Sequence, residues 1–300
     1  MVLPLLILLA LSLPFGAVMV IKGGTESTAH SRHYMASITV IENNHIWKAC
    51  GVFLVQEDSM LTVAHCYKSS AERLCADHWP TAESVHVETR AGVQYDRLSN
   101  NEQCLVVSHT PGGRLEVEEK QTCEKVVVIL GAHNFTRNEP TMQTILVIQA
   151  VPHPEYDPDS VFSDIMVLKL KRKARPNRAV KMISLPRSHD WVKPGQVCSV
   201  AGWGKTENDK FPNILQEVEL EVQEKKMCEQ LFSPYDDATQ LCVGNPLYLK
   251  NAEMGDSSAP LVCNNVAQGT VSNGFKNCSP GVFARISSFV SWIHKIVNAS

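Results

Sequence analysis

The sequence lacks a strong charge of either sign, a repeat, and a second long apolar run. The formal net charge is −3 over 300 residues, which is too small to indicate a nucleic acid as a partner. After residue 20 no apolar stretch reaches the roughly 18 uninterrupted residues that a membrane-spanning helix needs. Because 44% of the residues are hydrophobic and 20% are charged, the composition is typical of a globular protein with one or two cores.

Paired C-x-x-C spacing, which zinc sites usually have, is also missing from the sequence. The ten cysteines are many for a cytosolic enzyme of this size, so they favour an oxidising compartment and disulfide bonds. We therefore predict no metal site and no cofactor.

The first 20 residues lack any charged side chain and form either a signal peptide or a membrane anchor. The run is broken by Pro4 and Pro14 and leads into Gly16 and Ala17. These features favour a removed signal peptide with a short propeptide over a stable anchor.

Short apolar segments between turn residues fill most of the chain, which predicts an all-β barrel or sandwich. The clearest candidate strands are Gln143–Val151, Asp164–Leu170, Gln196–Gly202, Leu215–Val222 and Gln268–Val271. Helical spacing is clear only over Ser287–Val297, where Phe289, Ile293 and Val297 recur every four residues after a capping serine.

Residues 70–124 differ from the rest of the chain in composition. They carry ten acidic and five basic residues, a net charge of −5, and the three cysteines Cys75, Cys104 and Cys123. The segment is polar and lacks the alternation of a strand. Two interpretations remain open: a true surface extension beside a cleft of the folded protein, or non-coding sequence retained in a gene model.

Three short motifs carry residues for nucleophilic catalysis. The chain places His65 within 62–66 (TVAHC), Asp164 within 163–166 (SDIM), and Ser257 at the end of 255–257 (GDS). Hydrolysis of an amide needs a hydroxyl activated by an imidazole, and a carboxylate that fixes the imidazole tautomer. The order His, Asp, Ser along the chain is one of the known arrangements.

From Ile21 to the C-terminus, outside residues 70–124, the chain resembles chymotrypsin-like serine peptidases of the granzyme and mast-cell protease branch. The resemblance rests on the strings at 29–36 (AHSRHYMA), 130–134 (LGAHN), 162–166 (FSDIM), 193–195 (KPG), 198–204 (CSVAGWG) and 260–263 (PLVC).

This resemblance implies a fold of two antiparallel six-stranded β-barrels, at about 21–186 and 187–300, with a C-terminal helix. It also implies that Ser257 is the nucleophile and that His65 is the general base, oriented by Asp164. The N–H groups of Gly255 and Ser257 would form the oxyanion hole, and the new α-ammonium of Ile21 would pair with Asp256.

Three disulfides are likewise implied by the resemblance: Cys50–Cys66, Cys198–Cys263 and Cys228–Cys242. Cys278 is left without an assigned partner, together with the three cysteines of 70–124.

The primary specificity pocket is implied to have Asn251 at its base, a neutral residue that does not favour cleavage after Lys or Arg. The predicted wall consists of Ala252, Met254, Ser272, Gly274 and Gly281. A deep, neutral slot favours large apolar or aromatic side chains, as in chymases.

The resemblance further implies a monomer that is secreted or stored in the secretory granules of cytotoxic or mast cells. Its partners would be protein and peptide substrates, serpin-type inhibitors and an activating dipeptidyl peptidase.

The sequence departs from the family where small residues surround the nucleophile. Ser258 and Ala259 replace two glycines, Val52 replaces a glycine, Val63 replaces an alanine, and Asn273 replaces an aromatic residue. If either glycine position needs a positive φ, a Cβ there costs about 1–2 kcal/mol. The alternative hypothesis is therefore an impaired homologue that acts as a binding module or has no function.

Overall fold

The computed structural model describes residues 23–42, 45–67, 125–188, 190–204, 211–247, 257–274 and 279–299. Within 103–122 it also describes the backbone of four short strands, which form two pairs, β5 with β8 and β6 with β7. Their bounds are Gln103–Cys104 (β5), Val107–His109 (β6), Leu115–Val117 (β7) and Gln121–Thr122 (β8). The predicted signal peptide and most of 70–124 lie outside the described residues.

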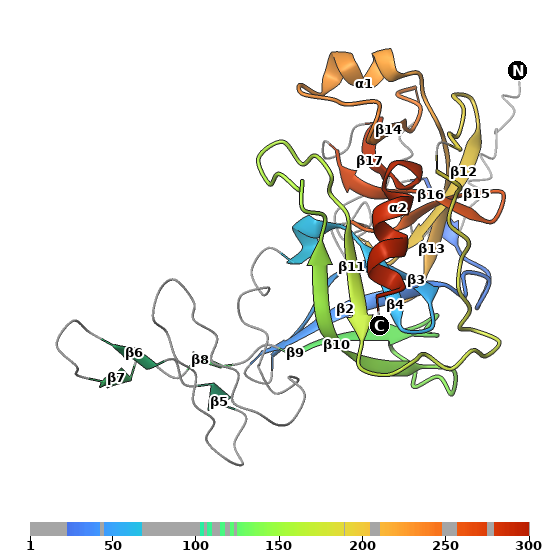
Figure 1. Ribbon diagram of the computed structural model, residues 1–300. Helices are drawn as coiled ribbons and strands as arrows, with labels where there is room; N and C mark the ends of the chain where they lie inside the picture. Colours follow the sequence, from blue (N-terminus) through green and yellow to red (C-terminus); the bar gives the residue numbers. More distant parts are fainter. Residues whose placement is uncertain are drawn as a thin grey trace, which may run out of the picture.

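The N-terminal half of the chain forms a closed antiparallel barrel in the order β10-β11-β4-β3-β2-β9, seen in the lower part of Figure 1. Apolar side chains that alternate along these strands fill the interior, among them Ile38, Leu54 and Val128, each at most 2% exposed. The six strands are Met35–Glu42 (β2), His45–Gln56 (β3), Ser59–Thr62 (β4), Lys125–Leu130 (β9), Gln143–Pro152 (β10) and Met166–Leu170 (β11).

The C-terminal half, together with β1 from near the N-terminus, forms a sheet in the order β1-β13-β12-β15-β16-β17-β14. An isolated antiparallel bridge between Val222 and Val243 joins the end of β13 to β14, so six of these strands close on themselves and β1 adds to β13 at the edge. The strands are Thr25–Glu26 (β1), Val197–Gly202 (β12), Gln216–Glu221 (β13), Gln240–Val243 (β14), Pro260–Cys263 (β15), Val266–Asn273 (β16) and Gly281–Arg285 (β17). The predicted two-barrel fold is confirmed.

A two-residue hairpin joins β15 to β16. Asn264 and Asn265 both have positive φ, +51° and +61°, which is the backbone of a type I′ turn and a conformation that asparagine adopts more readily than most residues. The hairpin returns the chain so that β16 pairs antiparallel with β15.

The C-terminal helix α2 (Ile286–Val297) buries Phe289, Ile293 and Val297, as the four-residue spacing predicts. The predicted serine cap is wrong. The N-cap residue is Arg285, no side chain caps the helix, and Ser287 lies within the first turn. The short helix α1 (Lys225–Leu231) was not predicted from the sequence.

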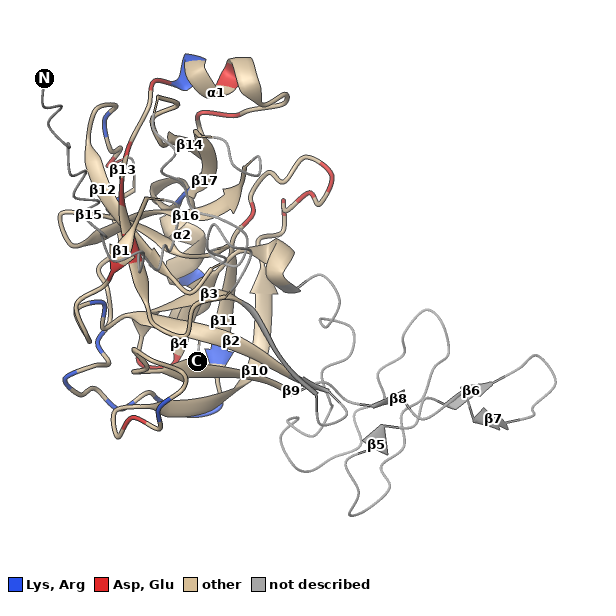
Figure 2. Cartoon of the chain, turned by 180° about the vertical axis from the view of Figure 1, so that it is seen from behind, with Lys and Arg blue, Asp and Glu red and all other residues tan. Residues whose placement is uncertain are grey.

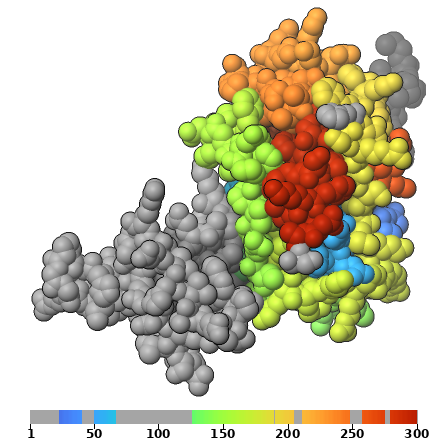
Figure 3. All heavy atoms as spheres, in the orientation of Figure 1, coloured from blue at the N-terminus to red at the C-terminus, as the bar shows by residue number. Residues whose placement is uncertain are grey.

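Helix α2 packs over the seam between the two barrels, on the face shown in Figure 3. It shares one apolar cluster with residues of both halves, including Phe53 and Ile165 from the first and Val262 from the second. The Lys169 ammonium donates to the carbonyl of Val297 at 2.8 Å, which satisfies a carbonyl at the end of the helix. The helix thus couples the two barrels whose junction carries the candidate site.

All three predicted disulfides, Cys50–Cys66, Cys198–Cys263 and Cys228–Cys242, are formed.

Figure 2 shows acidic and basic residues interspersed over both halves, and helix α1 carries both signs. No helix among the described residues is both long and apolar enough to cross a membrane.

Candidate active site

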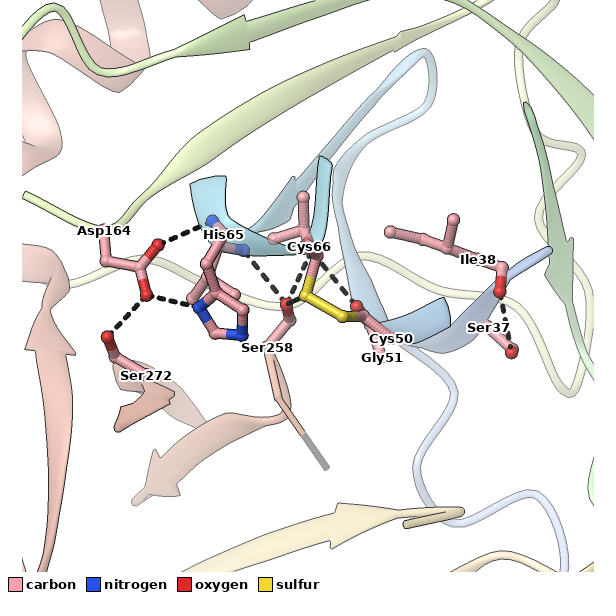
Figure 4. The surroundings of a disulfide bond; sticks show 11 residues. Ser37, Ile38, Cys50, Gly51, His65, Cys66, Asp164, Ser258 and Ser272 are labelled. Carbon is pink, nitrogen blue, oxygen red and sulfur yellow. Dashed lines mark hydrogen bonds and ion pairs between the residues drawn. A yellow bond between two sulfur atoms is a disulfide. The ribbon is translucent and has the colours of Figure 1, made fainter. Parts of the chain in front are cut away.

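Four segments from different parts of the chain meet at the junction of the barrels (Figure 4). His65 lies in a single 3₁₀ turn, η1 (Ala64–Tyr67), directly after β4. Asp164 precedes β11, Ser257 lies in the turn before β15, and Ser272 lies near the end of β16. The two barrels therefore contribute different residues to one site.

The His65 and Asp164 side chains form a paired hydrogen-bond arrangement. One Asp164 oxygen, Oδ1, accepts the backbone N–H of His65 at 3.0 Å, and the other, Oδ2, lies 2.7 Å from His65 Nδ1. The Asp164 side chain is fully buried, whereas that of His65 is 29% exposed. A carboxylate at Nδ1 selects the tautomer with hydrogen on Nδ1, so Nε2 presents its lone pair.

Ser272 contacts Asp164, a role that the sequence does not predict for it. Its hydroxyl donates to Asp164 Oδ2 at 2.5 Å. The buried carboxylate therefore accepts three hydrogen bonds, two from His65 and one from Ser272, as such a group requires. The two residues are 108 positions apart, so no local motif indicated the contact.

Ser257 is held by its backbone. Its carbonyl accepts the N–H of Gly51 at 3.0 Å. Within the described residues, no hydrogen bond involves the Ser257 hydroxyl. Hydrogen bonds of catalytic groups are often long without a substrate and tighten when one binds.

The larger residues around Ser257 differ in what they demand of the backbone. Ser258 has φ +75°, in the left-handed region that favours glycine. Ala259, Val52 and Val63 have ordinary φ and are completely buried, so the first barrel and the turn accommodate their side chains. The strain anticipated from the sequence therefore falls on Ser258 alone.

Part of the predicted specificity pocket is described. A Cβ on Gly274 would lie 3.6 Å from the Cα of Gly281, so the two glycines face one another across adjacent strands. Asn273 is exposed, and its amide oxygen accepts the N–H of Gly274 at 2.8 Å. The other predicted site residues lie outside the described residues: Ile21, Asn251, Ala252, Met254, Gly255 and Asp256.

A metal could be considered at one cluster of the described residues, formed by Cys50, His65 and Cys66. The two cysteines are joined in a disulfide, so their sulfurs are not thiolates and do not provide metal ligands. The donor set does not fit a metal ion.

Comparison with known proteins identifies the family of the chain. The sequence model of the family described as "Trypsin" matches residues 21–104 and 117–293. Granzyme-like protein 2 of Rattus norvegicus is 42% identical over 275 residues, 91% of this chain and 88% of its own length. Granzyme B of Homo sapiens is 40% identical over 296 residues, 97% of each chain. Cathepsin G of Mus musculus is 38% identical over 276 residues, 92% of this chain and 84% of its own.

A solved structure described as "Structure of GrC" superposes with a TM-score of 0.68 at 36% identity, covering 92% of this chain and 98% of that one. The chain therefore belongs to the trypsin family of chymotrypsin-like serine peptidases, in the branch of the granzymes and mast-cell proteases. It is a serine-type endopeptidase.

Proposed function

We propose that the protein hydrolyses peptide bonds with His65, Asp164 and Ser257 as its catalytic triad. The observation that carries the proposal is the pairing of His65 Nδ1 with the buried Asp164 carboxylate at 2.7 Å. This pairing leaves Nε2 unprotonated, which is the form that a general base must have.

In the first half of the reaction, His65 Nε2 takes the hydroxyl proton of Ser257 while the oxygen attacks the scissile carbonyl carbon. The resulting imidazolium is stabilised by Asp164 and then gives its proton to the leaving amine, which departs as the acyl-enzyme forms. In the second half, water gives a proton to His65 and attacks the acyl-enzyme, and His65 returns that proton to Ser257.

The oxyanion of each tetrahedral intermediate needs preorganised donors. By the family resemblance these are the backbone N–H groups of Gly255 and Ser257, and loss of one such donor typically costs about 3–4 kcal/mol of transition-state stabilisation. We propose that this hole forms only after cleavage before Ile21, when the new ammonium pairs with Asp256. N-terminal sequencing of active protein tests the cleavage site, and a start other than Ile21 contradicts it.

For specificity we propose a chymase-like preference for Phe, Tyr, Leu or Met before the scissile bond. Gly274 and Gly281 have no side chain that could fill the implied pocket, and Asn251 at its implied base is uncharged. A peptide library tests this preference: a profile led by Arg, Lys or Asp contradicts it, and Asn251→Asp should shift cleavage towards basic residues.

We also propose secretion through storage granules, with proteins and peptides as substrates. The support is the apolar segment at residues 1–20, the three disulfides and the granzyme, cathepsin G and mast-cell protease relatives. Serpin-type inhibitors and an activating dipeptidyl peptidase follow from the same resemblance. Fractionation of cells that express the full chain tests this, and recovery of the protein in the cytosolic fraction would contradict the proposal.

Labelling with a fluorophosphonate probe tests the triad directly. The probe reacts with a serine only when the general base and the oxyanion hole are assembled, so the chain starting at Ile21 should be labelled and its Ser257→Ala variant should not. Ser287→Ala is the matched control, since Ser287 is equally part of the folded core but lies in α2. A folded, correctly processed chain that is not labelled would favour the impaired homologue instead.

A further inference from the structure

The residue after the proposed nucleophile, Ser258, combines a rare backbone conformation with complete burial. Its φ is +75°, and none of its surface is exposed. A serine persists in the left-handed region only where its surroundings determine its conformation. The contacts of its hydroxyl therefore indicate what holds it there.

The Ser258 hydroxyl has three close neighbours, all in or next to the segment that carries His65. The backbone N–H of Val63 donates to Ser258 Oγ at 3.0 Å, and Thr62 Oγ1 lies 2.6 Å away. A sulfur of the Cys50–Cys66 disulfide, Cys66 Sγ, lies at 3.3 Å. Figure 4 shows the Ser258 hydroxyl directed towards this segment.

The directions of these hydrogen bonds follow from which groups can donate. The Val63 N–H only donates, so Ser258 Oγ accepts it. Thr62 Oγ1 donates to the Gly51 carbonyl at 3.2 Å, which uses its only hydrogen. The Ser258 hydrogen is then directed to Thr62 Oγ1, the strongest acceptor within reach. The result is a buried relay of hydrogen bonds. It runs from the Val63 N–H through the Ser258 and Thr62 hydroxyls to the Gly51 carbonyl, and each of these groups has a partner.

This relay closes a circuit that includes the nucleophile. Gly51, whose carbonyl ends the relay, donates its own N–H to the carbonyl of Ser257 at 3.0 Å. The other side of the turn is held by β16, where the Ser258 N–H donates to the Val271 carbonyl at 2.9 Å. The turn that presents Ser257 is thereby tied to Val63, two residues before His65, across the junction of the barrels.

We propose that Ser258 is a positioning residue that sets the distance between the Ser257 hydroxyl and His65, through the Val63–Ser258–Thr62–Gly51 relay. The proposal rests on the triad proposed above. A glycine at this position would have no hydroxyl, so the buried Val63 N–H would lose its acceptor and the turn its link to Thr62. Such bonds hold catalytic groups within the narrow range that reaction requires.

The test compares chains starting at Ile21 that carry Ser258→Ala, Ser258→Gly, Thr62→Val, and the Ser258→Ala/Thr62→Val pair. For each chain, kcat and KM are measured per active site titrated. Because misplacement of a catalytic group costs up to about 100-fold in rate, we expect each of the three single variants to lower kcat about 10-fold to 100-fold, with KM changed less than about twofold. The paired variant should be no slower than either of its single variants, because the two substitutions interrupt the same relay.

Two further variants separate positioning from general destabilisation. Thr62→Ser keeps a hydroxyl in the relay and should retain wild-type kcat. Ser287→Ala removes a buried hydroxyl that has no hydrogen-bond partner among the described residues and should leave kcat unchanged. Amide hydrogen exchange should show faster exchange of the Val63 N–H in Ser258→Ala than in Ser287→Ala, whatever the activity.

A kcat per titrated site within twofold of wild type in Ser258→Ala and Ser258→Gly would overturn the positioning role and leave the triad standing. A faster Ser258→Gly variant would overturn it as well, because the hydroxyl would then hinder the reaction. Failure of the folded, processed wild-type chain to react with a fluorophosphonate would instead remove the triad, and this proposal with it.

Discussion

Replacing Asp164 by asparagine changes one atom of the site and reverses the direction of a hydrogen bond. The carboxylate accepts from the His65 backbone, from His65 Nδ1 and from Ser272. An amide has one oxygen and one NH₂ group, so it accepts at one end only. If its oxygen keeps the His65 backbone N–H, the NH₂ group faces both Nδ1 and the Ser272 hydroxyl.

That orientation forces His65 into the other tautomer. With the NH₂ group donating to Nδ1, the imidazole carries its hydrogen on Nε2 and has no lone pair for the Ser257 proton. In serine peptidases this change lowers kcat about 10⁴-fold, or about 5.5 kcal/mol at 1.36 kcal/mol for each factor of ten. The fold should persist, because the amide has nearly the same volume and the site stays hydrogen-bonded.

The assay is kcat with a peptide thioester substrate, together with the rate of fluorophosphonate labelling, for Asp164→Asn and for the control Asp159→Asn. Asp159 lies exposed on the surface, so its substitution makes the same chemical change outside the site. Both rates should fall in the first variant and neither in the second. Retention of more than about a tenth of the wild-type kcat by a folded Asp164→Asn variant would refute the tautomer argument.

Three predictions concern stability. Replacing Cys198 and Cys263 by alanine should lower the free energy of unfolding by about 4 kcal/mol, because that bridge spans 65 residues; chemical denaturation measures the loss, and an unchanged midpoint contradicts it. Gly131→Ala should destabilise more than Gly195→Ala in thermal melting, because both have positive φ but only at Gly131 would a Cβ lie 2.3 Å from a backbone oxygen; equal losses contradict this. Burial lowers the pKa of His153 below 6.5. The contribution of this histidine to the free energy of unfolding is therefore complete above that pH and is lost as the pH falls through the lower folded pKa. The His153→Asn variant should lose less free energy of unfolding in acid than the wild type.

The sequence predicts the buried face of α2 but not where the helix begins. Phe289, Ile293 and Val297 recur at the helical period, and that face has to be buried somewhere. The start is set by tertiary contacts instead. Arg285, at the end of β17, pairs with Asp237 at 3.2 Å and packs against the Trp191 ring at 4.4 Å, so the helix begins directly after the strand.

Helix α1 was missed for a different reason. It has only seven residues, no side-chain cap and a single buried residue, Cys228. So short a segment completes barely two turns, so its apolar residues do not repeat often enough to reveal a helical period. Its position depends on the Cys228–Cys242 disulfide, which joins residues 14 positions apart, and on its packing against β14.

Within the site, the local strings predict His65 and Asp164 because each belongs to a recognisable motif. The third donor to the carboxylate, Ser272, has no such motif. The family resemblance predicts this serine in the wall of the specificity pocket, and its hydrogen bond to Asp164 depends on how β16 of the second barrel meets the loop before β11 of the first. A contact between two barrels can be identified only once their relative placement is known.

The substitutions after Ser257 show how a sequence departure acquires its meaning from the backbone. Ala259 has an ordinary φ and is fully buried, so its methyl group adds contacts without strain, and the departure there does not weaken the case for an enzyme. Ser258 carries a strain of about 1–2 kcal/mol from its positive φ, against which its hydroxyl makes two buried hydrogen bonds, with Val63 and Thr62, each worth about 1 kcal/mol net. The two contributions are of equal size. Ser258 therefore fits this turn at little net cost in stability, and the hypothesis of an impaired homologue has to rest on the geometry of catalysis, which kcat measures, rather than on a failure of the fold.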